Sequence, residues 1–117
     1  MNQKPNNYPL EERTEVFAQK IIQFCRSLKE DSISRPIIGQ LIRAGTSIGA
    51  NYMEANNASS RKDFRNKIYI CKKEAQETKY WPKMAREISD KEPIVPLSQE
   101  AQELTMIFQK IVSTIDK

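Results

Sequence analysis

The sequence contains no histidine and only two cysteines among its 117 residues. Without imidazole there is no Ser-His or Cys-His nucleophile pair and no His-ligated zinc site. Cys25 and Cys71 are far apart and form no Cys-x-x-Cys motif, so the sequence indicates neither a thiolate metal site nor a redox pair. We therefore expect a protein that is not an enzyme, with no catalytic residues, no metal and no cofactor.

Long uncharged apolar runs are also missing, and the mean hydropathy of −0.67 argues against a membrane span. Residues 1–7 contain no apolar core of a signal peptide. With three glycines, six prolines and 29% charged residues of both signs, the composition is neither low-complexity nor that of a disordered tail. We expect one domain over residues 1–117, located in the cytoplasm, with no membrane partner.

Apolar residues recur at alternating spacings of three and four, which is the period of an amphipathic helix. Four segments show this pattern, at about residues 10–29, 34–57, 60–89 and 98–115. Such segments joined by short links predict an all-α fold, an antiparallel up-down-up-down four-helix bundle. The expected inward-facing residues are Phe17, Ile21, Phe24 and Leu28, then Ile38, Leu41, Gly45, Ile48, Tyr52 and Ala55, then Phe64, Ile68, Cys71, Ala75, Thr78, Pro82 and Ala85, and finally Leu97, Ala101, Leu104, Phe108, Ile111 and Ile115. Val16, Ile22 and Cys25 are expected to widen the first stripe.

Several residues predict where the helices begin or bend. Three serines are the expected N-caps: Ser34, Ser60 and Ser98. Ser60 and Asp63 resemble a capping box with aspartate in place of the usual glutamate. Pro82 deprives one helical carbonyl of its donor, which predicts a kink. Residues 90–97 hold two prolines and are expected to form a stiff linker.

Two glycines lie inside the second predicted helix, at Gly45 and Gly49. Each costs about 1 kcal/mol relative to alanine in a helix interior. We expect another helix backbone to approach closely at these positions and to offset this cost.

The excess positive charge is confined to one segment. Residues 59–91 hold ten Lys or Arg against five Asp or Glu, whereas the rest of the chain holds nine against ten. Four of these cations repeat every seven residues, at positions 65, 72, 79 and 86, and a second row at positions 62, 69, 76 and 83 lies beside them on a helix. The two rows form one stripe, and a cationic stripe can follow a phosphate backbone. The predicted nucleic-acid-binding residues are Lys62, Arg65, Lys72, Lys79, Lys83 and Arg86. The alternative is an ordinary solvated helix face.

The other flank of this helix carries a mixed apolar and acidic row that includes Ile70 and Trp81. A single core does not need this row, although a widened core stripe would also explain it. Because tryptophan is enriched at interfaces, we favour self-association. The predicted oligomer interface comprises Arg43, Ser47, Ala50, Ile70, Glu74, Glu77 and Trp81. A carboxylate metal site formed by Glu54, Glu74 and Glu77 is disfavoured, because helical di-iron sites usually use Glu-x-x-His.

The string Arg-Ala-Gly-Thr-Ser-Ile-Gly-Ala-Asn at residues 43–51 resembles a known family. The family comprises small four-helix-bundle proteins first noticed as open reading frames in intervening sequences of bacterial 23S ribosomal RNA genes. The similarity continues through residues 59–64 and 73–81. Pro82 departs from the pattern, because an aliphatic residue is expected after Trp81.

The resemblance implies a closed homopentamer with no known enzymatic activity. A related protein, the accessory protein of diversity-generating retroelements, is a basic pentamer that binds nucleic acid and works with a reverse transcriptase. The charge distribution and the resemblance together predict a homo-oligomeric bundle that binds RNA or DNA through its basic stripe. The resemblance also implies a reverse-transcriptase-like or other protein as a partner. The alternative is a protein-interaction scaffold or accessory subunit with no direct role in nucleic-acid binding.

Overall fold

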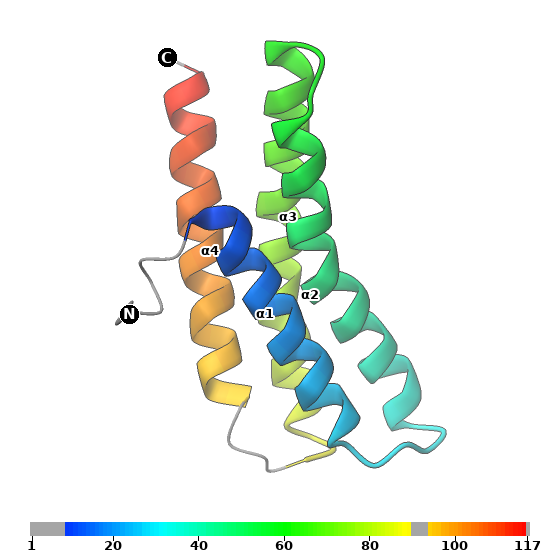
Figure 1. Cartoon of the computed structure of the whole chain (residues 1–117). Coiled ribbons are helices and arrows are strands. Elements are labelled where there is room, and N and C mark those ends of the chain that lie inside the picture. Colours follow the sequence, from blue (N-terminus) through cyan, green and yellow to red (C-terminus); the bar gives the residue numbers. More distant parts are fainter. Residues whose placement is uncertain (1–8, 90–93, 117) are drawn as a thin grey trace, which may run out of the picture.

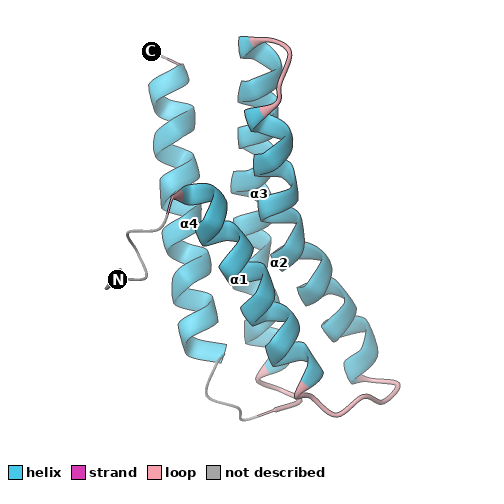
Figure 2. Cartoon of the chain, viewed as in Figure 1, coloured by secondary structure: helices cyan, strands magenta, loops and turns pink. Residues whose placement is uncertain are grey.

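The structure is a computed structural model that describes residues 9–89 and 94–116. It contains four α-helices: α1 (Leu10–Arg26), α2 (Ser34–Asn56), α3 (Arg61–Ala85) and α4 (Ile94–Ile115). No strand occurs in these residues, and Figure 2 shows helices connected only by loops. The predicted all-α fold class is confirmed. Successive helices run in alternating directions in Figure 1, which is compatible with an up-down-up-down bundle.

The helices do not contribute equally to the bundle. α2 and α3 form a long hairpin, α4 packs along α3, and α1 packs along α2 while touching α4 only slightly. α1 has 17 residues, against 23 in α2 and 25 in α3. It covers only the part of the hairpin nearer the α1–α2 loop, so the opposite end of the molecule is built from three helices (Figure 1).

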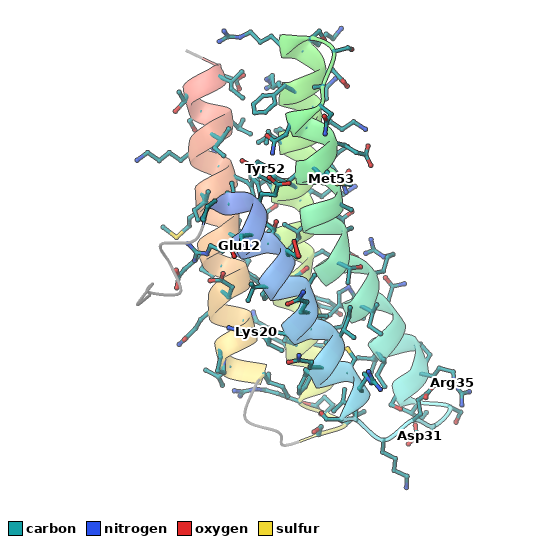
Figure 3. All side chains as sticks on the ribbon, in the orientation of Figure 1. Glu12, Lys20, Asp31, Arg35, Tyr52 and Met53 are labelled. Atoms are coloured by element: carbon teal, nitrogen blue, oxygen red, sulfur yellow. The ribbon has the colours of Figure 1, made fainter. Side chains whose placement is uncertain are left out.

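Because α1 covers only one end of the hairpin, the predicted core residues are less completely buried at the other end. All of the predicted inward-facing residues are buried except four, which are half-buried: Tyr52, Phe64, Ile111 and Ile115. These four belong to the three-helix end. There the Tyr52 ring contacts the Phe108 ring at a centroid distance of 5.9 Å (Tyr52 is labelled in Figure 3). The expectation that Ile22 widens the α1 stripe is wrong, because its side chain is 40% exposed.

The glycines of α2 are explained by α1 of the same chain. A Cβ placed on Gly45 would lie 2.8 Å from Cγ1 of the fully buried Ile21, and one on Gly49 would lie 3.1 Å from the Thr14 hydroxyl oxygen. A helix therefore does pack closely at both glycines, but the expected approach of its backbone is confirmed only at Gly49, where the Thr14 carbonyl carbon would lie 3.6 Å from the added Cβ, whereas Gly45 meets the Ile21 side chain. Both contacts occur within one protomer, so these two glycines give no support to self-association.

A buried arginine joins α1 to α4. Arg13 is 8% exposed, and its guanidinium donates to both carboxylate oxygens of Glu100, at 2.8 and 2.7 Å. It also donates to Glu103 at 2.8 Å. The hydrogen bonds from Arg13 to Glu100 raise the pKa of the guanidinium, which stays charged. Bidentate Arg–carboxylate pairs are strong and geometrically specific, so Arg13 fixes α1 against the otherwise distant α4. The three-four spacing of apolar residues in the sequence does not predict this ion pair.

The helix ends agree only partly with expectation. The Ser60 cap is confirmed, because its hydroxyl accepts a hydrogen bond from the backbone N–H of Asp63 at 3.0 Å. The Asp63 carboxylate, however, accepts from the backbone N–H of Ser59 and does not complete the reciprocal bond of a capping box. The prediction for Ser34 is wrong. Asp31 performs the capping, since its carboxylate accepts from the backbone N–H groups of Ile33 and Ser34.

The end of α3 and the start of α4 also differ from prediction. α3 continues past the buried Pro82 but ends at Ala85, four residues before the expected end at Ser89. α4 begins at Ile94, so neither the expected N-cap at Ser98 nor the full linker over residues 90–97 is correct. Pro96 is accommodated because the first helical turn has backbone N–H groups without intrahelical partners. Residues 90–93 lie outside the described residues.

No helix in the described ranges combines the length and apolarity that crossing a bilayer would require.

Candidate nucleic-acid interface

α3 separates two seams with different charge arrangements. On one side it meets α2, and we call this the α2 seam; on the other side it meets α4, and we call this the α4 seam. Both seams are surfaces of the same 25-residue helix. The predicted interface residues gather at the α2 seam, and most of the predicted nucleic-acid-binding cations lie toward the α4 seam and the outer face of α3.

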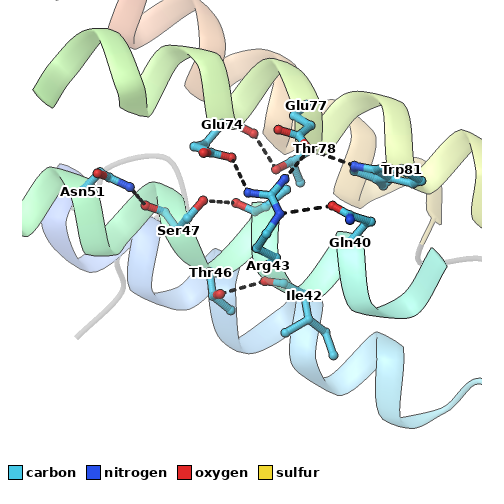
Figure 4. A network of polar contacts seen from close by, with 11 residues as sticks. Gln40, Ile42, Arg43, Thr46, Ser47, Asn51, Glu74, Glu77, Thr78 and Trp81 are labelled. Carbon is cyan, nitrogen blue, oxygen red and sulfur yellow. Dashed lines mark hydrogen bonds and ion pairs between the residues drawn. The ribbon is translucent and has the colours of Figure 1, made fainter. Parts of the chain in front are cut away.

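A polar network links α2 to α3 at the α2 seam (Figure 4). Arg43 donates to the Glu74 carboxylate at 3.2 Å, and also forms an ion pair with Glu77. A third donor of Arg43 reaches the Gln40 side chain at 3.1 Å. The indole N–H of Trp81 donates to Glu77 at 3.2 Å, so Glu77 accepts from both Arg43 and Trp81. Each charged side chain of this network therefore has an oppositely charged partner within the same chain.

The electrostatics of this network follow from these contacts. Partial burial would raise the pKa of Glu77, but the hydrogen bonds from Arg43 and Trp81 outweigh it and lower this pKa below its ordinary value. The hydrogen bond to Glu77 likewise raises the pKa of Arg43. Lys67 and Glu54 form a second ion pair across the same seam at 2.8 Å. The charged residues of the α2 seam are therefore largely neutralised by one another.

The remaining predicted interface residues line the same surface. Ser47 is half-buried, and its hydroxyl donates to the Ala44 carbonyl on its own helix. Ala50 is exposed, and the Ile70 side chain is 36% exposed. Trp81 is half-buried against the core, which fits the widened-core alternative in part. By the three-four spacing of a helix, Ser47 and Ala50 share the face of α2 that carries Arg43, and Ile70 shares the face of α3 that carries Glu74, so the seven predicted residues border one seam.

The cations near the α4 seam are arranged differently. Among the described residues, five of the predicted nucleic-acid-binding cations have no carboxylate partner: Lys62, Lys72, Lys79, Lys83 and Arg86. The Lys79 ammonium donates instead to the neutral Gln102 side chain at 2.7 Å. The sixth, Arg65, forms a bidentate ion pair with Asp116 at 2.5 and 2.9 Å. We call the five unpaired residues the cationic flank.

An exposed aromatic ring lies among these cations. Tyr69 is 48% exposed, with the Lys72 ammonium 5.2 Å and the Arg65 guanidinium 5.8 Å from the ring centroid. Cation–π attraction at an exposed site is about 0.5–1 kcal/mol, which positions a cation without neutralising it. The Tyr69 ring thus positions the Lys72 ammonium without supplying a carboxylate counter-charge.

No cluster of three or more metal-ligating side chains occurs in residues 9–89 and 94–116. Cys25 and Cys71 are buried, and burial raises the pKa of their thiols to about 11 and about 12. Both thiols are therefore protonated near neutral pH and poorly nucleophilic.

The family model described as "23S rRNA-intervening sequence protein" matches residues 8–110. The chain belongs to this family. The structure is also similar to the crystal structure of a protein of unknown function from the S23 ribosomal protein family of Bacteroides thetaiotaomicron VPI-5482. The TM-score is 0.78 at 32% sequence identity, over 89% of this chain and 98% of that one. No curated protein matches.

Family membership confirms the resemblance found at residues 43–51. The structure adds a reason for several residues of that string. Arg43 forms the network with α3, Gly45 and Gly49 admit α1, and the Asn51 side-chain amide donates to the Ser47 carbonyl at 2.8 Å. These roles all stabilise the protomer.

Sequence reasoning missed the α4 residues that border α3. Gln102 on α4 and Asp116, directly after α4, contact Lys79 and Arg65 of the stripe, but they lie more than 20 residues away from these cations along the chain. Their acidic and amide side chains follow no pattern that marks them as partners of α3. Only the packing of α4 on α3 reveals them.

Proposed function

We propose that this protein is a non-enzymatic nucleic-acid-binding protein of the 23S rRNA-intervening sequence family, which binds RNA or DNA through the cationic flank. The observation that carries this proposal is the contrast between the seams. At the α2 seam Arg43 and Lys67 have carboxylate partners, whereas Lys62, Lys72, Lys79, Lys83 and Arg86 have none among the described residues.

Unpaired cations in a row are suited to a polyanion. From Lys62 to Arg86 the row extends roughly 36 Å at 1.5 Å per helical residue, long enough to meet several successive phosphates. Each phosphate neutralised by a lysine or arginine releases condensed counterions, which favours binding most strongly at low salt. Arg65 contributes less to this binding, because Asp116 already neutralises it.

The test is a salt titration with the full chain. Fluorescence anisotropy is measured with labelled single-stranded RNA, single-stranded DNA and duplex DNA of random sequence between 50 and 200 mM salt. We expect log K to fall linearly with log salt concentration, with a slope that reports the number of phosphates contacted. Absence of binding at the lowest salt, or binding that does not weaken with salt, contradicts the proposal.

We also propose that the protein acts as a homo-oligomer that buries the α2 seam. The charged side chains at this seam already form ion pairs within one chain. A second subunit that covers the seam therefore needs to supply few further counter-charges. Ala50 and the partly exposed Ile70 and Trp81 provide the apolar contacts that an interface core needs. The expectation of five subunits comes from the resemblance alone.

Light scattering tests the assembly. Ile70→Lys should lower the mass of the wild-type oligomer, because it places an unpaired charge in the proposed interface. The matched variant Met106→Lys changes an exposed apolar residue of α4, away from the α2 seam, and should leave the mass unchanged. A wild-type protein that is monomeric at micromolar concentration contradicts the proposal.

A further inference from the structure

A groove opens between the C-terminal part of α3 and the N-terminal part of α4. It has a volume of about 660 Å³ and is lined mainly by apolar atoms. Lys83 and Arg86 of the cationic flank form one wall, and Val95, Ser98 and Gln102 belong to the other. Sites that bind small molecules or single chemical groups typically have volumes of roughly 300–1,000 Å³. The groove is thus large enough for a flat ring together with part of its backbone.

The polar groups of the groove are mostly hydrogen-bond donors. The carbonyl oxygen of the Gln102 side chain accepts from the Lys79 ammonium at 2.7 Å, which directs the amide N–H groups of Gln102 elsewhere. Lys83 and Arg86 have donors and no acceptors. The carboxylate of the lining, Glu103, forms an ion pair with Arg13 at 2.8 Å. The groove therefore fits a ligand with an apolar face and acceptor oxygens at its edge.

An unpaired nucleobase next to its phosphate has this chemistry. Its ring faces are apolar, its edges carry carbonyl oxygens or ring nitrogens, and its phosphates are anionic. In a duplex the ring faces are covered by stacking, and flipping a base out of the duplex costs free energy, so a single strand presents its bases to such a groove most readily. We propose that the groove receives a base of single-stranded nucleic acid while Lys79, Lys83 and Arg86 contact the flanking phosphates.

This inference rests on the proposed nucleic-acid function and adds the form of the ligand. It predicts a contribution from the base in addition to the electrostatic attraction of the phosphates. Val95, 44% exposed, offers apolar contact to the base, while Arg86 remains with the phosphates. A protein that contacts phosphates alone would not distinguish strands of equal charge.

The test compares two strands with the same number of phosphates. One is a 15-nucleotide single-stranded DNA of mixed sequence, and the other is a 15-unit abasic strand with the same sugar-phosphate backbone. With the full wild-type chain at 100 mM salt, we expect the strand with bases to bind at least tenfold more tightly. Equal affinities overturn the inference but leave the proposed function intact. If neither strand binds at low salt, the proposed function fails together with the inference.

A neutral substitution then tests the groove itself. Ser98→Leu fills the groove without changing charge, and we expect it to reduce the affinity for the strand with bases by about tenfold while leaving the affinity for the abasic strand unchanged. Ser113→Leu is the matched control, because it makes the same change on an exposed part of α4 away from the groove. Equal effects of the two variants on the strand with bases would overturn the assignment to this groove. Circular dichroism and light scattering verify that both variants keep the wild-type fold and mass.

Discussion

α2 and α3 pack against each other along the same hairpin, yet their unusual residues have different explanations. α2 contains glycines inside a helix, and each buried one meets a side chain of α1. Its Arg43 is bound by Glu74 and Glu77 of α3. α3 contains a row of cations, and five of them have no carboxylate partner in the described part of the chain. Gly45, Gly49 and Arg43 of α2 are thus accounted for inside one protomer, whereas the five residues of the cationic flank are not.

This difference separates stability from binding. A residue whose cost is offset inside the chain needs no external partner to explain it. Charges that remain unpaired are solvated at little cost and stay available to a polyanion. We therefore expect substitutions in α2 to change the free energy of unfolding, and substitutions in the cationic flank to change the affinity for nucleic acid.

The largest expected effect concerns the cationic flank. Replacing Lys79, Lys83 and Arg86 by Gln should weaken nucleic-acid binding on the order of tenfold to a hundredfold at 50 mM salt and reduce the salt slope by about three, one for each lost phosphate contact. Anisotropy titrations at several salt concentrations measure both quantities. The free energy of unfolding should change little, because none of these residues forms an ion pair in the described structure.

The matched control removes the same charge elsewhere. Lys20 and Arg26 on α1 and Lys110 on α4 are exposed and outside the cationic flank (Lys20 is labelled in Figure 3). Their triple Gln variant should keep most of the affinity. If both triple variants weaken binding equally, net charge alone controls the affinity, and the comparison between the helices fails.

The second prediction concerns the glycines of α2. Gly45→Ala forces a Cβ against the buried Ile21, and overpacking of a core typically costs about 1–3 kcal/mol. The gain in helix propensity, about 1 kcal/mol, offsets part of this cost. We expect a net destabilisation of about 1 kcal/mol in urea unfolding, with unchanged nucleic-acid affinity.

Gly39→Ala provides the matched variant on the same helix. A Cβ at Gly39 meets no atom within 4 Å, so the substitution should stabilise the protein by about 0.5–1 kcal/mol. If Gly45→Ala were as stabilising as Gly39→Ala, the close packing of α1 on α2 would be refuted.

The third prediction concerns the network at the α2 seam. Arg43→Gln removes the cation from Glu74 and Glu77, whose side chains are 15% and 32% exposed, and should cost about 1 kcal/mol of unfolding free energy. Arg35→Gln breaks a pair in which both side chains are 66% exposed, and should cost less than about 0.5 kcal/mol. Equal losses in urea unfolding would mean that the network adds nothing beyond an ordinary surface pair.

The smallest effect is a pH dependence at the same network. The pKa of Glu77 is lowered in the folded state, because the hydrogen bonds from Arg43 and Trp81 outweigh burial. Its stabilising contribution is therefore present above the ordinary glutamate pKa of about 4.3 and is lost as the pH falls through the lower folded-state value. Urea unfolding followed by the fluorescence of Trp81, the single tryptophan, should show this loss between pH 6 and pH 3. Glu77→Gln should show a shallower dependence, and an identical dependence would contradict the pKa shift.

Much of the fold could be predicted from the sequence because the relevant signals are local. The three-four spacing placed Ile68, Cys71 and Ala75 on one face of α3, and all three are buried. Ser60 was recognisable as a cap because its partner lies three residues away. The ends of α1 and α3 were placed too late, because the apolar period continues beyond the residues that keep helical hydrogen bonds. The start of α4 was also placed too late, because Pro96 was interpreted as part of a linker although proline fits the first turn of a helix.

The candidate site could be predicted only in part. The sequence located the excess charge on α3, but it could not distinguish Arg65, which is paired with Asp116, from Lys72, which has no carboxylate partner in the described structure. It also could not show that Arg13 joins α1 to α4. These contacts involve residues 51 or more positions apart, and their side chains follow no periodic pattern.

By itself, the sequence determined that four amphipathic helices bury one apolar face each and that the positive charge lies on the third, because periodicity and charge are properties of neighbouring residues. Only the tertiary structure decided which charges are neutralised, which glycines are needed and where a groove remains. Those outcomes depend on how closely distant helices approach one another, and a short α1 makes that approach unequal along the bundle.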